Sequence, residues 1–242
     1  MVRGHVRRTG GYAGGGAVRR SLPPALAALV GIGLVVAAAG GMFSSTPKAA
    51  RPASSTQVAA LQSAAQAMEQ AASFDYSVVI QTGKGSTSVH GTFEAPDREE
   101  MYLSAPGVTA TEVLFAGSQV WLMTPGGTWA QQSAATATAT VGKPTTFFSA
   151  LASVENVNVV PNQGVFGQRL QFTLPASAAA SLLQGTGSST SAGIQGTATL
   201  SSGLLDGLTF TIDNAGTPVT IDVSYSAVGS AAPVQLPAGA TA

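Results

Sequence analysis

The sequence predicts an α+β fold with one large antiparallel sheet of about ten or eleven strands and about three helices. Three observations lead to this prediction. Apolar and polar residues alternate in short segments such as RLQFTL (169–174) and VTIDVSY (219–225), which is typical of strands with one buried face and one wet face. Turn-forming glycines, as at 83–85, separate such segments at short range. Residues 55–74 show helical spacing instead.

The N-terminal part of the chain differs in composition from the remainder. Seven of the eleven Lys and Arg residues lie within the first 51 positions, and all eleven carboxylates follow them. Residues 22–43 carry no charge and consist mostly of Leu, Val, Ala and Gly, which is enough for a spanning helix of roughly 20 apolar residues. Because five arginines precede this segment, the positive-inside rule places the N-terminus in the cytoplasm.

These features predict a basic cytoplasmic leader (1–21), a transmembrane signal anchor (22–43), a Pro- and Ser-rich linker (44–54) and one extracytoplasmic domain (55–242). The alternative is a cleaved export signal, because the small residues at 37–39 fit an A-x-A cleavage site, and the protein would then be secreted. The chain has no cysteine, so neither a thiol-linked lipid nor a disulfide is expected. The acidic balance of the exported part argues against a nucleic-acid partner, which needs a basic face.

The exported domain begins with an Ala-rich amphipathic helix within 55–74. Its inward positions recur at spacings of three and four: Val58, Leu61, Ala65, Met68 and Ala72. About five strands follow, then a short helix (144–154), two strands, a second short helix (176–185) and three strands. Several early strands, such as 111–117 and 119–123, are partly apolar on both faces, so they are expected to lie deeper in the fold or under a cover.

Few residues of the exported domain are suited to catalysis or metal binding. His90 is its only histidine and shares strand parity with polar neighbours, which indicates a surface position. With one histidine and no cysteine, a zinc site has too few ligands. The sequence therefore predicts no catalytic residue, no metal site and no cofactor, and it disfavours an enzyme such as a hydrolase.

Four carboxylates cluster in one predicted hairpin, at Glu94, Asp97, Glu99 and Glu100. Paired carboxylates can hydrolyse glycosides when a cleft brings them together. Within the turn sequence EAPDREE, beside Arg98, they indicate a solvated turn instead.

Short motifs occur in the order found in a known family. APDR (95–98) follows the second predicted strand, GSQVW (117–121) leads to GGTW (126–129), and the last strand precedes Pro233 and Pro237. With these motifs, the chain resembles the actinobacterial LppX/LprA/LprF/LprG lipoproteins over most of its exported domain.

The resemblance implies a LolA-like half-barrel, in which helices occupy the concave side of a strongly curved antiparallel sheet. It also implies that acyl chains lie between sheet and helices, and that the protein binds or moves lipids, lipoglycans or lipoproteins in the cell envelope, with an envelope transporter as a potential partner. Gly40 and Gly41 stand where these lipoproteins carry the lipid-bearing cysteine. The apolar segment 22–43 is therefore expected to replace the lipid anchor.

An apolar concave face covered by Ala-rich rather than bulky helices can enclose a cavity, in which each buried acyl CH₂ contributes about 0.8 kcal/mol. The expected lipid-binding residues come from inward strand positions and from the short helices: Val78, Ile80, Phe93, Val113, Phe115, Val120, Leu122, Phe147, Phe148, Leu151, Leu170, Phe172, Leu182 and Phe210. The sequence thus predicts a membrane-tethered lipid-binding protein. A non-catalytic envelope sensor or protein-interaction domain of the same fold is the alternative.

Overall fold

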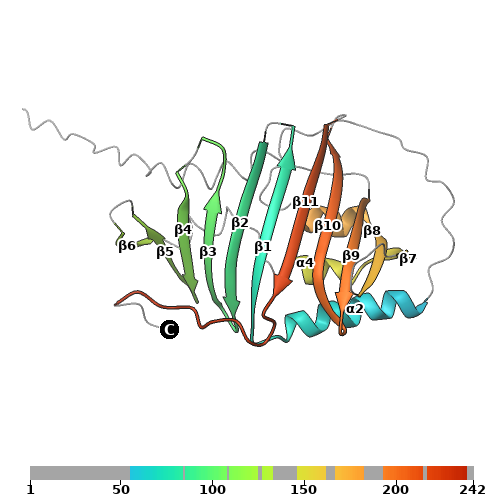
Figure 1. The fold of residues 1–242 in the computed structure, drawn as a ribbon, viewed down its shortest axis with the longest axis horizontal. Coiled ribbons are helices and arrows are strands. Elements are labelled where there is room, and N and C mark those ends of the chain that lie inside the picture. Colours follow the sequence, from blue (N-terminus) through green and yellow to red (C-terminus); the bar gives the residue numbers. More distant parts are fainter. Residues whose placement is uncertain are drawn as a thin grey trace, which may run out of the picture.

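The computed structural model describes residues 55–83, 85–107, 109–124, 127–132, 146–161, 167–182, 193–214 and 217–238 (Figure 1). The expected leader, anchor and linker, residues 1–54, lie outside this part of the chain. The elements run in the order α2 (Ser55–Glu69), β1 (Ser73–Thr82), β2 (Gly85–Glu94), β3 (Arg98–Ser104), β4 (Thr111–Ala116), β5 (Gln119–Met123), β6 (Trp129–Gln132), α4 (Thr146–Leu151), β7 (Glu155–Val160), β8 (Gln168–Leu174), α5 (Ala176–Leu182), β9 (Ile194–Ser201), β10 (Leu204–Asn214) and β11 (Thr217–Ser226).

The strands form one eleven-stranded antiparallel sheet in the order β6-β5-β4-β3-β2-β1-β11-β10-β9-β8-β7. Strands β1–β6 make one meander and β7–β11 a second, and the meanders join where β1 pairs with β11. Connections within a meander link neighbouring strands, for which short turns suffice, although the connection from β8 to β9 includes α5. The connection from β6 to β7 instead leads from one edge of the sheet to the other and includes α4.

The sequence correctly predicted one large antiparallel sheet with ten or eleven strands, and three helices occur in the described part of the chain. It expected about five strands before the second helix, and the structure has six. The additional strand, β6, is only four residues long. Such a segment is too short to show an alternating pattern, so it could be found only through its pairing with β5.

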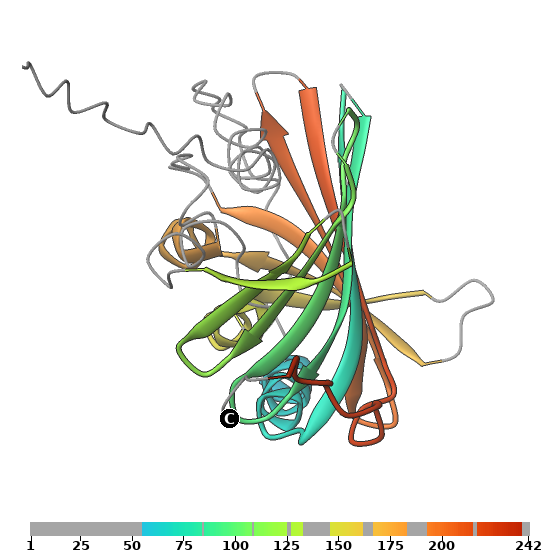
Figure 2. The ribbon, with the colours of Figure 1, turned by 90° about the vertical axis from the view of Figure 1, so that its left-hand side faces the viewer.

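The described helices lie on one face of the sheet, which we call the inner face (Figures 1 and 2). Figure 2 shows the twist of the sheet, whose strands turn from steep at β1 to nearly horizontal at β7 and β8. Helix α2 packs against β7, β9, β10 and α4, while α5 packs against α4 and β8. The helices thus cover mainly the β7–β10 half of the inner face.

Helix α2 uses small residues to approach the sheet closely. Its buried side chains are Leu61, Ala64, Ala65 and Met68, which follow the predicted stripe. The prediction for Ala72 is wrong, because the helix ends at Glu69 and Ala72 lies exposed at the bend before β1. At the other side of the contact, the Gln62 side-chain amide donates to the carbonyl of Ala152, at 2.9 Å, and so ties α2 to the end of α4.

The C-terminal tail (residues 227–238) covers part of the opposite, outer face. In Figure 1 this tail runs beneath the sheet from the end of β11 towards β4–β6. Its buried Val234 packs with Leu114 and Trp121, and its backbone N–H donates to Oε2 of Glu94 at 2.9 Å. This tail is a cover of the kind expected for strands that are partly apolar on both faces.

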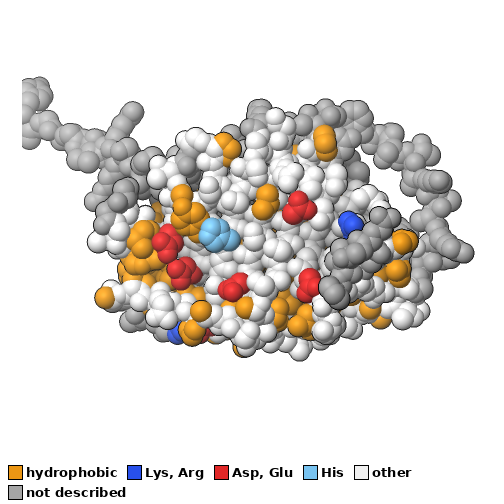
Figure 3. All heavy atoms as spheres, in the orientation of Figure 1, with side chains coloured by type: hydrophobic (Ala, Val, Ile, Leu, Met, Phe, Trp, Pro, Cys, Tyr) orange, Lys and Arg blue, Asp and Glu red, His pale blue; other side chains and the backbone are white. Residues whose placement is uncertain are grey.

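The remainder of the outer face is largely polar. Figure 3 shows this face, where acidic side chains and a histidine lie among polar atoms and scattered apolar side chains. His90 is exposed, and its ring lies 4.9 Å from that of Tyr102 on the neighbouring strand. The predicted surface position of His90 is therefore confirmed. Within the described ranges, no helix combines the length and apolar character needed to cross a membrane.

Candidate functional site

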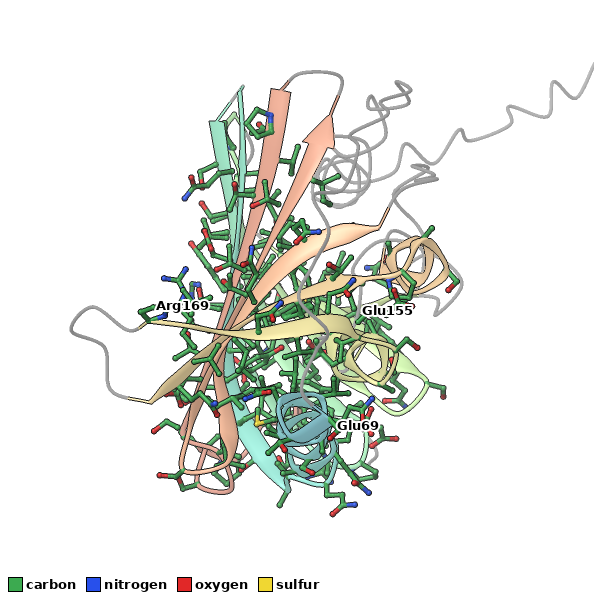
Figure 4. All side chains as sticks on the ribbon, turned by 90° about the vertical axis from the view of Figure 1, so that its right-hand side faces the viewer. Glu69, Glu155 and Arg169 are labelled. Atoms are coloured by element: carbon green, nitrogen blue, oxygen red, sulfur yellow. The ribbon has the colours of Figure 1, made fainter. Side chains whose placement is uncertain are left out.

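The residues expected to bind lipid converge on the inner face. Those that are fully buried belong to one continuous apolar core: Val113, Val120, Leu122, Phe148, Leu151, Leu170, Phe172 and Phe210. Those that are half-buried and pack against this core are Val78, Phe93, Phe115 and Phe147. Ile80 is half-buried on the same face of β1, and Leu182 ends α5 with a side chain outside the described part of the chain. Figure 4 shows side chains filling the space between sheet and helices.

A glycine in β9 makes room for the large aromatic rings beside it. A Cβ atom at Gly196 would lie only 2.5 Å from Cζ of Phe172, so this ring crosses directly over the glycine. Phe210 meets Phe172 edge to face at a centroid distance of 6.0 Å, and Phe147 stacks on Phe210 at 5.7 Å with a 19° interplanar angle. Ring contacts thus hold the start of α4 against β10.

A second aromatic group occupies the centre of the inner face. Phe74 and Phe93 stack across β1 and β2 with ring centroids 5.0 Å apart. Phe148 of α4 contacts the edge of Phe74 at 5.8 Å and lies 5.3 Å from Tyr225 of β11. Such ring pairs stabilise a core by about 0.5–1.5 kcal/mol beyond their buried area. Helix α4 is therefore anchored over both halves of the sheet.

Burial falls along the inner face of β1. Tyr76 is buried, whereas Val78 and Ile80, which follow it on the same face, are only half-buried. The strand register places Ile80 beside Ile221 of β11, and Ile221 beside Phe210 of β10. Ile80 and Ile221 are therefore half-buried neighbours on β1 and β11, and Ile221 borders the buried Phe210 of β10.

We call these half-buried residues, together with the aromatic residue that stacks beside them, the apolar band: Val78, Ile80, Phe147, Ile212 and Ile221. These side chains stay partly accessible beside the buried core, and accessible apolar surface of this kind is found at ligand-binding sites. The apolar band is therefore the part of the inner face best suited to meet a ligand.

A polar group lies within the otherwise apolar inner face, below the apolar band along β1 and β11. The Tyr76 hydroxyl donates to Oε1 of Glu99 at 2.5 Å. Gly91 permits this reach across β2, because a Cβ atom there would lie 2.9 Å from the Tyr76 hydroxyl oxygen. Tyr225 is the register partner of Tyr76 in β11. The exposed fractions of Tyr76, Glu99 and Tyr225 are 5%, 5% and 6%. We call these three residues the buried polar group.

The solvated position expected for Glu99 is wrong, whereas Asp97 is exposed as predicted and Glu94 and Glu100 are half-buried. Arg98 forms an ion pair with Glu94 at 3.4 Å. Glu99 faces inward because it pairs with Phe93 on one side and Phe115 on the other, both on the inner face. Strand parity was the signal for this position, since Glu99 shares it with the apolar residues two and four positions later.

The environment of the buried polar group acts on both phenols. Burial raises the pKa of Tyr76 well above its usual value, and the charge of Glu99, the hydrogen bond to Glu99 and the nearby Tyr225 raise it further. Burial also raises the pKa of Tyr225. Both hydroxyls therefore keep their protons and act as hydrogen-bond donors at physiological pH.

Figure 4 labels Glu69 on α2, Glu155 on β7 and Arg169 on β8, which lie far from one another on this side of the molecule. Across the described ranges, no cluster of three or more His, Cys, Asp or Glu side chains could hold a metal ion.

Comparison with known proteins gives a result at the level of the fold. No family model matches the chain, and no curated protein matches it in sequence. Among solved structures, LprF from Mycobacterium bovis is similar with a TM-score of 0.59 and 14% identity, covering 78% of this chain and all of LprF. The Mycobacterium tuberculosis lipoprotein LppX is similar with a TM-score of 0.54 and 14% identity, covering 76% of this chain and all of LppX. The chain therefore has the fold of LprF and LppX, two of the four lipoproteins named by the resemblance in its sequence motifs.

Proposed function

We propose that this protein binds acyl chains on the inner face of its sheet and carries or presents acylated lipids, lipoglycans or lipoproteins in the cell envelope. The apolar band is the observation that carries this proposal. It offers aliphatic and aromatic side chains on β1, β10, β11 and α4 that are only half-buried. The shared fold with LprF and LppX supports the same function, because the resemblance to that family implies lipid binding.

Binding needs no catalytic residue in this scheme. Each CH₂ group of an acyl chain that leaves water contributes about 0.8 kcal/mol, so a stretch of ten such groups would contribute about 8 kcal/mol before the costs of association. The half-barrel geometry belongs to this proposal, in which the inner face is the concave side and the helices lie over the bound chain. The protein would act by sequestering lipid from water rather than by chemical conversion.

The position of the protein in the cell is part of the same proposal. The apolar segment 22–43 would hold the N-terminus in the membrane, and the linker 44–54 would place the domain on the extracytoplasmic side. A tether of this kind keeps the apolar band close to its lipid source. An envelope transporter would then supply or receive the lipid.

Photo-crosslinking in the source cell tests the proposal with the full chain. A photoreactive benzoylphenylalanine replaces Ile80 in one variant and, as the matched control, Val79 in another. Both side chains are half-buried on neighbouring positions of β1, but they point to opposite faces of the sheet. The proposal expects adducts with the mass of an acylated lipid at position 80 and at most a tenth as many at position 79.

Two results would contradict it. Equal lipid adducts at both positions would mean non-specific contact with membrane lipid. Adducts at position 80 that contain protein instead of lipid would favour the alternative of a protein-interaction domain.

A further inference from the structure

The buried polar group is unusual because one of its members has no hydrogen-bond partner. The Tyr225 hydroxyl oxygen is buried, and no donor or acceptor in the described part of the chain bonds to it. Most buried polar side-chain atoms in proteins have at least one partner. An unpaired hydroxyl beside the Tyr76–Glu99 hydrogen bond therefore points to a group from outside the chain.

We infer that Tyr76, Glu99 and Tyr225 form a subsite for an uncharged oxygen group, such as a hydroxyl or an ester carbonyl, that an acylated ligand carries. This inference rests on the proposed lipid function, and it adds the chemical class of the group that the ligand brings to the inner face. It concerns residues that the expected lipid-binding set did not include.

The donor and acceptor pattern selects an oxygen acceptor. The Tyr225 hydroxyl has a proton to donate, and Tyr76 already donates its own to Glu99. A hydroxyl or ester oxygen on the ligand would accept from Tyr225. A hydrocarbon would leave this hydroxyl unpaired, which a buried site penalises.

The charge pattern disfavours an anion. Glu99 lies in the same apolar surroundings, with Phe93 and Phe115 as its register neighbours, and its carboxylate accepts a hydrogen bond from the Tyr76 hydroxyl. A second carboxylate or a phosphate beside it would face like-charge repulsion in a poorly screened environment. The subsite therefore discriminates between neutral lipids and free fatty acids.

The position of the subsite fits an acyl chain on the apolar band. Tyr76, Val78 and Ile80 succeed one another on the inner face of β1, and their register partners in β11 are Tyr225, Val223 and Ile221. A strand rises about 3.2–3.4 Å per residue, so Tyr76 and Ile80, four positions apart, are separated by about 13–14 Å along it. This length matches about ten methylene groups at the ~1.3 Å that an extended hydrocarbon spans per carbon. A neutral polar group at Tyr225 and a chain along Val78 and Ile80 can therefore belong to one ligand.

A competition assay tests the inference. The full-length protein, held in solution by an amphipathic polymer, binds a pyrene-labelled hydrocarbon, and three C18 competitors displace this probe. Monoolein carries an ester and hydroxyls, oleate carries a carboxylate, and 1-octadecene carries no polar group. The wild type is expected to bind monoolein at least tenfold more tightly than either of the others at pH 8. Tyr225→Phe should weaken monoolein binding at least fivefold and leave 1-octadecene binding unchanged, which also shows that the variant is folded. Tyr102→Phe, on the exposed outer face, is the control and should behave as the wild type.

The outcomes separate this inference from the proposed function. Suppose all three competitors displace the probe, and monoolein binds better than the others by the same factor in the wild type and in Tyr225→Phe. This result would overturn the subsite and leave lipid binding intact. Tighter binding of oleate than of monoolein would also overturn the subsite. So would an equal loss of affinity for monoolein and 1-octadecene in Tyr225→Phe, because Tyr225 would then have a structural role only. Displacement by none of the three would contradict lipid binding itself, and the subsite with it.

Discussion

The hydroxyl of Tyr76 reaches across Gly91 and donates to the buried carboxylate of Glu99, which links β1 to β3 over the intervening strand. The register places Phe93 and Phe115 on either side of Glu99. A buried carboxylate is costly unless donors surround it. The bond between Tyr76 and Glu99 therefore contributes to the stability of the inner face.

Tyr76→Phe should lower the free energy of unfolding by about 1–3 kcal/mol, because a buried carboxylate loses a hydrogen-bond donor. Urea denaturation followed by circular dichroism measures this change. Tyr102→Phe is the control, since Tyr102 is exposed on the outer face, and should change stability by less than about 0.5 kcal/mol. Equal stabilities of Tyr76→Phe and wild type would mean that the bond is unimportant in solution.

Gly196→Ala should destabilise the protein by about 1–3 kcal/mol, because the new methyl group overlaps the ring of Phe172 in a packed core. The ring cannot retreat freely, since Phe210 lies against it. Phe172→Leu removes the overlapping atoms, so the double variant should be more stable than the sum of the single changes predicts, by about 0.5–3 kcal/mol. Strict additivity in this double-mutant cycle would contradict the contact.

Val234→Ala should cost about 1–2 kcal/mol, because two buried methyl groups of the C-terminal tail lose their contacts with the outer face of β4 and β5. Thermal unfolding gives the difference. Gln235→Ala removes the neighbouring, exposed side chain and should be neutral within about 0.5 kcal/mol. If both variants have the same melting temperature as the wild type, the tail does not stabilise the sheet.

Glu100→Gln should raise the melting temperature at neutral pH. Glu100 and Glu112 lie close together on the outer face, and burial, a hydrogen bond to Glu112 and the charge of Glu112 raise the pKa of Glu100. A carboxyl group whose folded pKa is raised binds more protons in the folded state than in the unfolded state. Its penalty is therefore absent below the unfolded pKa of about 4.5 and grows as the pH rises towards the folded value.

The gain from Glu100→Gln should accordingly shrink to nothing as the pH falls below about 4.5. Melting curves of wild type and variant between pH 4 and pH 8 show this convergence. Asp206→Asn removes an exposed carboxylate in β10 and serves as the charge-matched control, with no such gain at neutral pH. A constant difference between Glu100→Gln and wild type across the range would rule out the proposed coupling to Glu112.

Much of the local structure could be predicted from residue order, because strands and helices have their own periods. The alternation in 169–174 predicted that Leu170 and Phe172 are buried and that Gln171 is exposed, and the structure confirms each position. The three-and-four spacing in α2 likewise predicted the burial of Leu61 and Met68. The prediction was wrong where the local signal was short, as in β6, or where a pattern continued past the end of the element, as at Ala72.

The sequence by itself determined which residues share a face of a strand or helix, since that depends only on backbone geometry within one element. Only the tertiary structure decided which faces meet, because β1 and β11 are paired over a separation of more than a hundred positions. That pairing places Tyr225 beside Tyr76 and Ile221 beside Ile80, and so creates both the buried polar group and the apolar band. The charge of Glu99 predicted a solvent-exposed side chain. Its position in β3 puts it on the inner face of the sheet, where the carboxylate is buried in the core.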